Sequence, residues 1–586
     1  MTPKPAIVVC LCVALLAGGW FVWRLLEADR QLVEAAIGDA QVREIEQQQR
    51  ELAAGSGGKR RDLGDEEIDR IVSEELRNQV ADALIERLVQ LMLANQLSAI
   101  KNEAVLAFPD EDGMETLLKR IESTSSGVEL VATLDVLQAI RLRFEDMEDL
   151  RDLLAGITED EGISIDANYA VRIPNYPIPD PDAPLAGASG GAPFRNNALR
   201  FLGVDPGENA NWGEGVTVAV IDSGVAEHPT FREGQVRHVG EIKEVPEAEP
   251  GANPIPDGHG TAVASIIAGS DSRTPGVAPA AGILSFQLLD DEGSGDSFTL
   301  AQMMTDAVDL GADLINLSLG SYGDSLLVRE AVAYASEHQR LVIASTGNDA
   351  TDSIAFPAAY EDSIAVGAID AQGEHLEFSN SGEQLDLAAP GLAVDAAWPN
   401  NQMVGFSGTS ASAPFVTGAI AAVMSEIPGM RPVQAWELLR QFTDEAGAPG
   451  MDPLFGSGNL NLGRLMERDQ RGIHDVAVVS HHFAPESEFV QNVQVTVQNR
   501  GTELVQNLSL EVNSSNRVLG FVIPMLQPGQ IATREVPVDL RRADADGHVS
   551  IQSEARLSRQ VQDRIPANNL RQSIIEFPES ETAVNP

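Results

Sequence analysis

The sequence contains almost no cysteine. Its 586 residues include only two, Cys10 and Cys12, and both lie in an apolar stretch near the N-terminus. Because no thiol follows them, the rest of the chain can form neither a disulfide framework nor a cysteine nucleophile. Cysteine-dependent hydrolases are therefore excluded.

Basic residues are also scarce. The chain has 40 Lys and Arg against 88 Asp and Glu, which gives a formal net charge of −48. Such a negative field repels a phosphate backbone and excludes nucleic acid as a partner. An acidic, lysine-poor composition is typical of salt-adapted proteins and also of many extracellular bacterial proteins, so both alternatives stay open.

Long uncharged runs are rare as well. Residues 6–23 form one, at the short end for a membrane span and at the long end for a signal-peptide core. The run ends in WFVW and Arg24, without a small-x-small cleavage pattern. These features favour an uncleaved anchor at residues 1–23, with the membrane as a partner, over a removed signal peptide. Both alternatives predict an extracytoplasmic protein, either membrane-anchored at the cell surface or periplasmic side, or secreted.

The length of the chain predicts several domains. Residues 24–100 are helix-prone, with apolar residues at helical spacing from about Glu66, which predicts a helical stalk or packing helix. Residues 101–174 predict strands and helices in the order β-α-β-β-α-β, the ferredoxin-like α+β arrangement. Residues 175–193 are rich in Pro, Ala and Gly, which predicts a linker.

The middle of the chain, residues 194–467, alternates apolar runs with helical stretches. The runs of strand length are residues 217–221, 283–289, 314–319, 341–345 and 363–368. Strands buried on both faces and separated by helices predict an α/β domain with a doubly wound, mostly parallel sheet. Residues 474–577 change to short alternating strands with turn signals, which predicts a β-sandwich.

Three short segments place polar residues where sites are commonly built. Asp222 ends a buried strand in VAVIDSG, at the carboxyl edge of the predicted sheet. His259 is flanked by glycines in DGHGT and opens an apolar helix. Ser410, in GTSASAP, opens another helix that has Pro414 in its first turn. Each residue alone has a simpler interpretation as a turn or helix cap.

Taken together and in this order, the DSG, HGT and GTSxxAP segments resemble the signatures of the subtilisin-like serine proteases, peptidase S8. The resemblance covers about residues 194–467. It implies a serine endopeptidase that hydrolyses polypeptide substrates in extended conformation through an acyl-enzyme. In the family's Asp-His-Ser triad, Ser410 resembles the nucleophile and His259 the base. Asp222 resembles the residue that orients the imidazole and stabilises the imidazolium.

The same resemblance implies further site residues. Asn348, in ASTGN, resembles the oxyanion-hole asparagine, which acts together with the backbone N–H of Ser410. Two segments resemble the edges that bind extended substrate, namely Gly293-Ser294-Gly295 and Ser318-Leu319-Gly320. A calcium loop is the alternative interpretation of the acidic residues 290–296, but their spacing does not match an EF-hand. The chain departs from the family at Ala262 and Ala411, where His and Met are usual, and neither change removes a catalytic group.

The flanking domains have resemblances of their own. Residues 101–174 resemble the inhibitor-I9-like propeptide of the family, and residues 474–577 resemble the adhesion-related CARDB domains. These resemblances imply a self-processing zymogen whose own propeptide is a partner, with the cut between Arg172 and Arg195.

No cofactor is expected for the chemistry, and no metal site is predicted. The pair His481-His482 lacks accompanying carboxylates or cysteines, and we interpret it as solvated. Structural calcium is implied by the family, although no ligand set can be recognised. A binding or scaffold protein built on an inactive protease is the alternative from another class, but it requires a lost catalytic group and none is missing.

Overall fold

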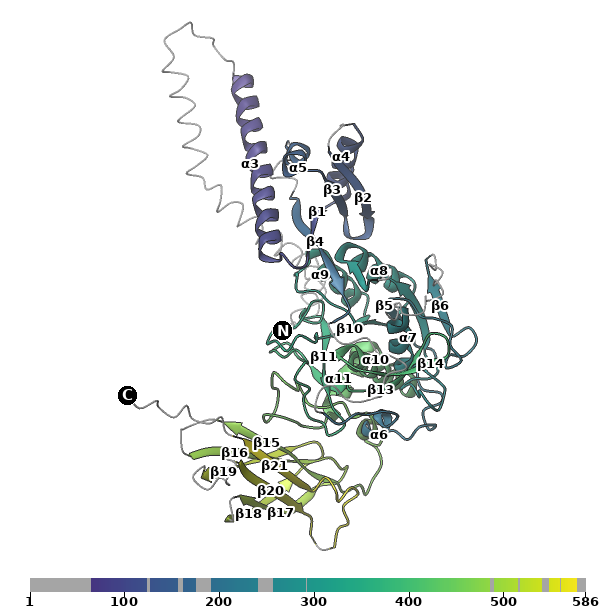
Figure 1. Ribbon diagram of the computed structural model, residues 1–586, viewed down its shortest axis with the longest axis vertical. Helices are drawn as coiled ribbons and strands as arrows, with labels where there is room; N and C mark the ends of the chain where they lie inside the picture. The colour runs from purple at the N-terminus through teal and green to yellow at the C-terminus, as the bar shows by residue number, and fades with distance from the viewer. Residues whose placement is uncertain are drawn as a thin grey trace, which may run out of the picture. The chain divides into compact units, whose positions relative to one another are not determined.

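Figure 1 shows the helices and strands of the computed structural model. The predicted anchor at residues 1–23, the stalk up to residue 64 and the linker at 175–190 lie outside the described residues. Within the part that is described, no helix is long and apolar enough to span a membrane. The structure describes residues 65–123, 127–155, 157, 162–174, 191–240, 257–290, 292–484, 490–514, 517–539, 548–558 and 560–576.

Residue contacts divide the chain into two units. The first unit runs to Ala170 and includes the short segments Asp296–Phe298 and Gly323–Glu330. The second contains the remaining residues. Each is described below by itself.

The first unit is an antiparallel sheet with helices. The four strands β1 to β4 pair in the order β2-β3-β1-β4, and the secondary structure elements follow one another as the sequence predicts. Asp146 caps α5 by accepting hydrogen bonds from two backbone N–H groups of the first turn. The elements are α3 (Asp65–Ala94), β1 (Ala99–Ala107), α4 (Glu111–Ser123), β2 (Val128–Leu134), β3 (Ala139–Phe144), α5 (Met147–Leu154) and β4 (Ser164–Arg172).

Helix α3 contributes to the core of this unit. Val80, Leu84 and Leu88 repeat every fourth residue and are buried with Leu142 and Leu150. Residues at this spacing share one face of a helix, so this part of α3 packs against the sheet. The described part of the predicted stalk is therefore a packing helix of the domain.

The two short segments join the first unit through polar contacts with β4. Asn168 Oδ1 accepts hydrogen bonds from Ser297 Oγ at 2.9 Å and from the backbone N–H of Phe298 at 3.1 Å. Asp166 accepts one from the backbone N–H of Leu326 at 2.7 Å. Both acceptors are buried, and these bonds satisfy N–H groups at the starts of two helices.

The second unit contains the parallel sheet that the sequence predicts. Its strand order is β12-β11-β10-β9-β5-β7-β6, and all its pairs of neighbouring strands are parallel. The strands are β5 (Thr217–Asp222), β6 (Val236–Val239), β7 (Gly282–Gln287), β9 (Leu314–Leu317), β10 (Leu341–Ser345), β11 (Ser363–Ile369) and β12 (Leu387–Pro390).

Shorter strands and the helices complete this α/β domain. The short strands are β8 (Ser294–Asp296), β13 (Val394–Trp398) and β14 (Gln402–Phe406). The helices are α6 (Ala198–Phe201), α7 (Asp257–Ala268), α8 (Ser297–Asp309), α9 (Leu326–Glu337), α10 (Thr409–Glu426), α11 (Pro432–Leu439) and α12 (Leu462–Met466).

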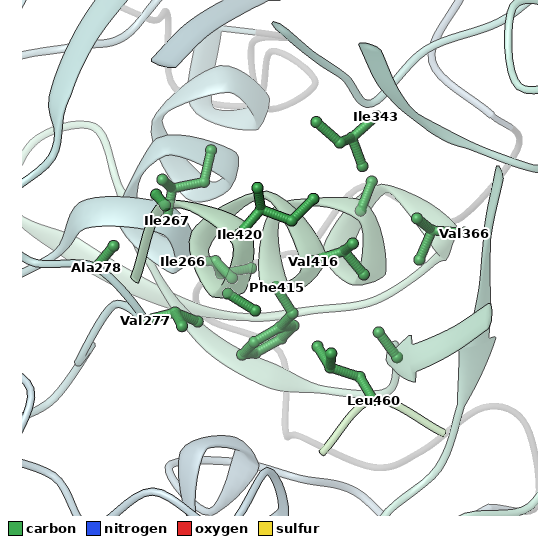
Figure 2. Packing of buried hydrophobic residues seen from close by; sticks show 14 of the residues in the cluster. Ile266, Ile267, Val277, Ala278, Ile343, Val366, Phe415, Val416, Ile420 and Leu460 are labelled. Carbon is green, nitrogen blue, oxygen red and sulfur yellow. The ribbon is translucent and has the colours of Figure 1, made fainter. Parts of the chain in front are cut away.

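Helix α10 lies at the centre of the hydrophobic core. Every residue from Thr409 to Val423 is buried, because the helix is apolar on all sides. Figure 2 shows Phe415 and Ile420 of α10 among the side chains of this core, which include Ile267 of α7 and Val366 of β11. The first turn of α10 is therefore fixed by packing around the whole helix.

The C-terminal residues of the second unit form two antiparallel sheets that share one core. One sheet has the order β15-β16-β19 and the other β18-β17-β20-β21. Val495 and Val536 of the first sheet belong to the same buried cluster as Leu508 and Ile551 of the second. The strands are β15 (Val476–Ala484), β16 (Val490–Asn499), β17 (Val505–Ser514), β18 (Arg517–Leu526), β19 (Ile531–Asp539), β20 (His548–Arg556) and β21 (Leu570–Glu576).

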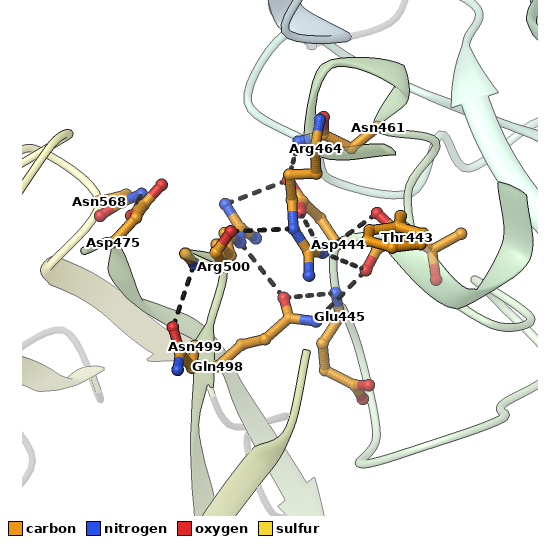
Figure 3. Close-up of polar contacts among 12 residues, drawn as sticks. Thr443, Asp444, Glu445, Asn461, Arg464, Asp475, Gln498, Asn499, Arg500 and Asn568 are labelled. Atoms are coloured by element: carbon orange, nitrogen blue, oxygen red, sulfur yellow. Dashed lines mark hydrogen bonds and ion pairs between the residues drawn. The ribbon is translucent and has the colours of Figure 1, made fainter. Parts of the chain in front are cut away.

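Polar contacts join these sheets to the α/β domain (Figure 3). Arg464 of α12 and Arg500, which follows β16, each form an ion pair with Asp444, at 3.1 and 3.2 Å. Gln498 Oε1 accepts a hydrogen bond from the backbone N–H of Glu445 at 3.1 Å. Buried charges need such partners, since an unpaired one would carry a large desolvation cost.

Truncation of Phe415 should test the central role of α10. Phe415 is 2% exposed, and Phe415→Ala should lower the free energy of unfolding by about 3–5 kcal/mol because it leaves a cavity. Leu310→Ala is the control, because Leu310 is 44% exposed and its loss should cost little. Urea unfolding measures both effects. Equal transition midpoints for the two variants would contradict the central role of α10 in the core.

Glu445 should make the stability depend on pH. Burial, with a smaller contribution from Asp452, raises the pKa of Glu445 to about 7. The folded state therefore favours the neutral acid, and stability is lost as pH rises from about 4.5 through 7. Glu445→Gln, which cannot ionise, should raise the melting temperature at pH 8 but not at pH 4. Calorimetry at both pH values checks this, with the exposed Glu361→Gln as the control; an equal gain at both would contradict it.

Candidate active site

A buried carboxylate and an imidazole form the first part of the site. Asp222 is the last residue of β5 and is fully buried, and His259 lies in the first turn of α7. Nδ1 of His259 lies 2.8 and 3.0 Å from the two carboxylate oxygens. The backbone N–H of Ser223 donates a further bond of 2.7 Å to Asp222. A carboxylate at Nδ1 keeps the proton there and leaves Nε2 as an acceptor.

Close packing fixes the orientation of the His259 ring. The Phe406 ring meets it edge-on, with ring centres 5.1 Å apart and an angle of 78° between the planes. A Cβ at Gly260 would lie 2.2 Å from the carbonyl oxygen of Gly224, so the start of α7 approaches β5 only because glycine stands there. The sequence motif includes this glycine but gives no sign of Phe406.

Ser410 lies in the first turn of α10, which packs against α7. Its Oγ donates a hydrogen bond to the carbonyl oxygen of Ser318 at 3.2 Å, and Ser318 Oγ donates to the carbonyl of Ser410 at 3.0 Å. His259 Nε2 is buried and accepts no hydrogen bond from any described residue. The hydroxyl and the base thus stand in the first turns of two adjacent helices, and an imidazole can activate a serine hydroxyl that turns toward it.

Asn348 presents an unused donor in the same region. Its Oδ1 accepts bonds from the backbone N–H of Thr409 at 2.9 Å and from Thr409 Oγ1 at 2.8 Å. Its Nδ2 is buried and has no hydrogen-bond partner among the described residues. A Cβ at Gly408, whose φ is 116°, would lie 2.8 Å from this Nδ2. An amide donor held next to the helix N-terminus can stabilise developing negative charge. Sequence reasoning identified Asn348 but missed Thr409, which orients it.

The two predicted substrate edges both contact an extended segment of the chain itself. Arg172 and Gly320 exchange two backbone hydrogen bonds of 2.9 Å each. On the other side, the backbone N–H of Ile173 donates to the carbonyl of Gly293 at 3.4 Å. Of the remaining edge residues, Ser294 and Gly295 lie in β8, and the Leu319 side chain is fully buried.

The acidic loop that begins at Asp290 contains a hydrogen-bonded turn. Asp290 Oδ1 accepts the backbone N–H groups of Glu292 and Ser294 at 3.0 and 2.9 Å, as in a turn. Among the described residues, no group of three or more His, Cys, Asp or Glu side chains could hold an ion.

The interpretation of the His481-His482 pair as solvated is wrong for His481. The ring of His481 lies between Ser553 and Ser573, with nitrogen-to-oxygen distances of 2.8 and 2.9 Å. Burial lowers its pKa to about 4. Side chains alternate in direction along β15, and the side chain of His481 points toward the other sheet. With its pKa lowered, His481 is a neutral, hydrogen-bonded histidine.

Comparisons with known proteins show the family of this chain. The family model described as "Subtilase family" matches residues 213–458. Subtilisin Savinase from Lederbergia lenta is 36% identical over 253 residues, covering 42% of this chain and 90% of that protein. The chain belongs to the subtilase family. It is therefore a serine endopeptidase.

Two other similar proteins extend the comparison. The thermostable alkaline protease of Halalkalibacterium halodurans is 32% identical to this subtilase over 273 residues, covering 46% of this chain and 73% of that protein. The crystal structure of fervidolysin from Fervidobacterium pennivorans, a keratinolytic enzyme related to subtilisin, matches with a TM-score of 0.52. It is 22% identical and covers 82% of this chain and 77% of that one, so it supports the fold alone.

Proposed function

We propose that this subtilase cleaves peptide bonds with Ser410 as nucleophile, His259 as general base and Asp222 as the group that orients the base. The observation that carries the proposal is the pairing of a fully buried carboxylate with His259 Nδ1 at 2.8 Å. This pairing leaves Nε2 as an acceptor at the start of a helix that packs against the one bearing Ser410.

The reaction follows from these positions. The Ser410 hydroxyl turns from the Ser318 carbonyl to His259 Nε2, gives up its proton there and attacks the substrate carbonyl carbon. Asn348 Nδ2 and the Ser410 backbone N–H then stabilise the negatively charged oxygen. His259 donates the proton to the leaving amine, so the peptide bond breaks and an ester with Ser410 remains. A water molecule, deprotonated by Nε2, hydrolyses that ester.

Extended polypeptide is the proposed substrate. The edges Gly293–Gly295 and Ser318–Gly320 offer backbone groups on two sides of a strand, which suits binding through main-chain hydrogen bonds. The pairing of Arg172 with Gly320 and of Ile173 with Gly293 supports this use of the edges.

We also propose that the enzyme is made as a zymogen. The element order of residues 101–174 and their strand order β2-β3-β1-β4 support a ferredoxin-like, inhibitor-I9-like propeptide. The segment at its C-terminal end is held between the two edges, which supports inhibition by occupation. Self-cleavage between Arg172 and Arg195 would then separate propeptide and enzyme.

The remaining assignments complete the proposal. Residues 474–577 are a β-sandwich similar to CARDB domains, with a spacing or binding role. Residues 1–23 direct the chain out of the cytoplasm as an anchor or a signal peptide. Structural calcium is proposed from the family alone, because none of the described residues identifies its ligands.

Replacement of Ser410 should abolish protein hydrolysis and propeptide release together. Ser410→Ala removes the nucleophile, so casein hydrolysis should fall by about 10⁶-fold and propeptide release should stop. Ser412→Ala is the matched control, because its hydroxyl lies in the same helix and bonds the Ala389 carbonyl at 3.0 Å. Release of a propeptide-sized fragment from the Ser410→Ala protein, seen by mass spectrometry, would refute self-processing.

Removal of the Thr409 hydroxyl should weaken stabilisation of the oxyanion. Thr409→Val keeps the shape but removes one of the two hydrogen bonds that hold Asn348, so kcat should fall about tenfold while KM changes little. Thr409→Ser should retain activity. Steady-state kinetics on a peptide substrate measure the effect, and equal losses in the Val and Ser variants would contradict the role.

A further inference from the structure

The segment Val171–Pro174 lies in the substrate edges like a peptide strand. Arg172 forms both hydrogen bonds of its pair with Gly320, and the bridge is antiparallel. The neighbouring Ile173 turns its N–H to the opposite edge, at the Gly293 carbonyl. All these residues belong to the second unit.

Extended by one further hydrogen-bonded pair, this register would place Pro174 opposite Ser318. In an antiparallel pair, residues that exchange hydrogen bonds recur at every second position. Two residues after Arg172 comes Pro174, and two residues before Gly320 comes Ser318. The residue at position 174 would therefore donate its N–H to the Ser318 carbonyl, but proline has no N–H.

The Ser318 carbonyl has a different donor in the structure, the hydroxyl of Ser410 at 3.2 Å. His259 Nε2 has no partner among the described residues. A backbone N–H at position 174 would compete for the Ser318 carbonyl and favour the turn of the hydroxyl toward the base. With proline at that position this competition is absent.

We propose that Pro174 slows self-processing. Because of Pro174, the tethered strand binds as an inhibitor and resists cleavage. The inference rests on the proposed function, and it adds a residue that determines specificity in that reaction. A good substrate donates an N–H to the Ser318 carbonyl beside Ser410, and Pro174 cannot. The bond between Pro174 and Asn175 therefore stays intact, and the activating cut falls later in the linker. The enzyme also rejects other peptides with proline at this position.

The test compares self-processing of the full chain with that of its Pro174→Ala variant. In the variant, water adds hydroxide to the carbonyl carbon of residue 174 and hydrogen to the amine of Asn175, which becomes a new N-terminus. We expect this N-terminus to appear, and propeptide release to be about tenfold faster or more than in the wild type. Pro177→Ala, in the same linker, is the matched control and should process as the wild type does.

Mass spectrometry of timed samples gives both the rate and the position of the cut. Cleavage of the wild type after Pro174 at the rate of the Pro174→Ala variant would overturn the proposal. So would a variant that processes at the wild-type rate and positions.

A second arm does not depend on folding of the variant. Synthetic peptides of residues 164–180, with the wild-type sequence or with Pro174→Ala, are added to the active enzyme. The wild-type peptide should inhibit and stay intact at the bond after Pro174, while the Pro174→Ala peptide should be cut after residue 174. If casein is hydrolysed but both peptides behave alike, the proposed role of Pro174 is wrong and the proposed function stands. If purified wild type hydrolyses neither casein nor peptide, the proposed function fails.

Discussion

The buried carboxylate of Asp222 is the constraint on which the active-site region depends. A charge without solvent is tolerated only where donors meet it, and here the donors are the Ser223 N–H and His259 Nδ1. Satisfying that charge requires the start of α7 to approach the end of β5, which only glycine at position 260 allows. The same contact fixes which nitrogen of the imidazole carries the proton, so a requirement of folding also prepares a base.

Helix α10 connects this constraint to the rest of the core. Because the helix is buried on all sides, the position of its first turn is set by packing against the parallel sheet and α7. Thr409 and Ser410 in that turn face two different partners, Asn348 and Ser318, which follow neighbouring parallel strands. Parallel strands end at one edge of a sheet, and this topology brings residues far apart in sequence to one place.

The sequence predicted the parts of the fold that depend on local pattern. Continuous apolar runs predicted the parallel strands of the second unit, and the motifs singled out Asp222, His259, Ser410 and Asn348, whose chemical roles remain proposals. Thr409 and Phe406 were missed because their importance lies in contacts across the fold rather than in a pattern. His481 was misjudged for the same reason. Two adjacent histidines look solvated in sequence, but alternation along β15 turns one of them inward to two serines.

A cleft that binds any extended backbone cannot use its hydrogen bonds to tell its own chain from a substrate. A tethered strand has the advantage, because attachment gives it a high effective concentration at the edges. If it were also a good substrate, it would be cut and would lose the attachment that gives it this advantage. A strand that is to stay tethered in the cleft must therefore bind along most of its length and resist reaction at the bond beside Ser410. A proline placed two residues beyond a fully paired Arg172 meets both requirements, since it leaves the paired part intact and removes one donor beside Ser410.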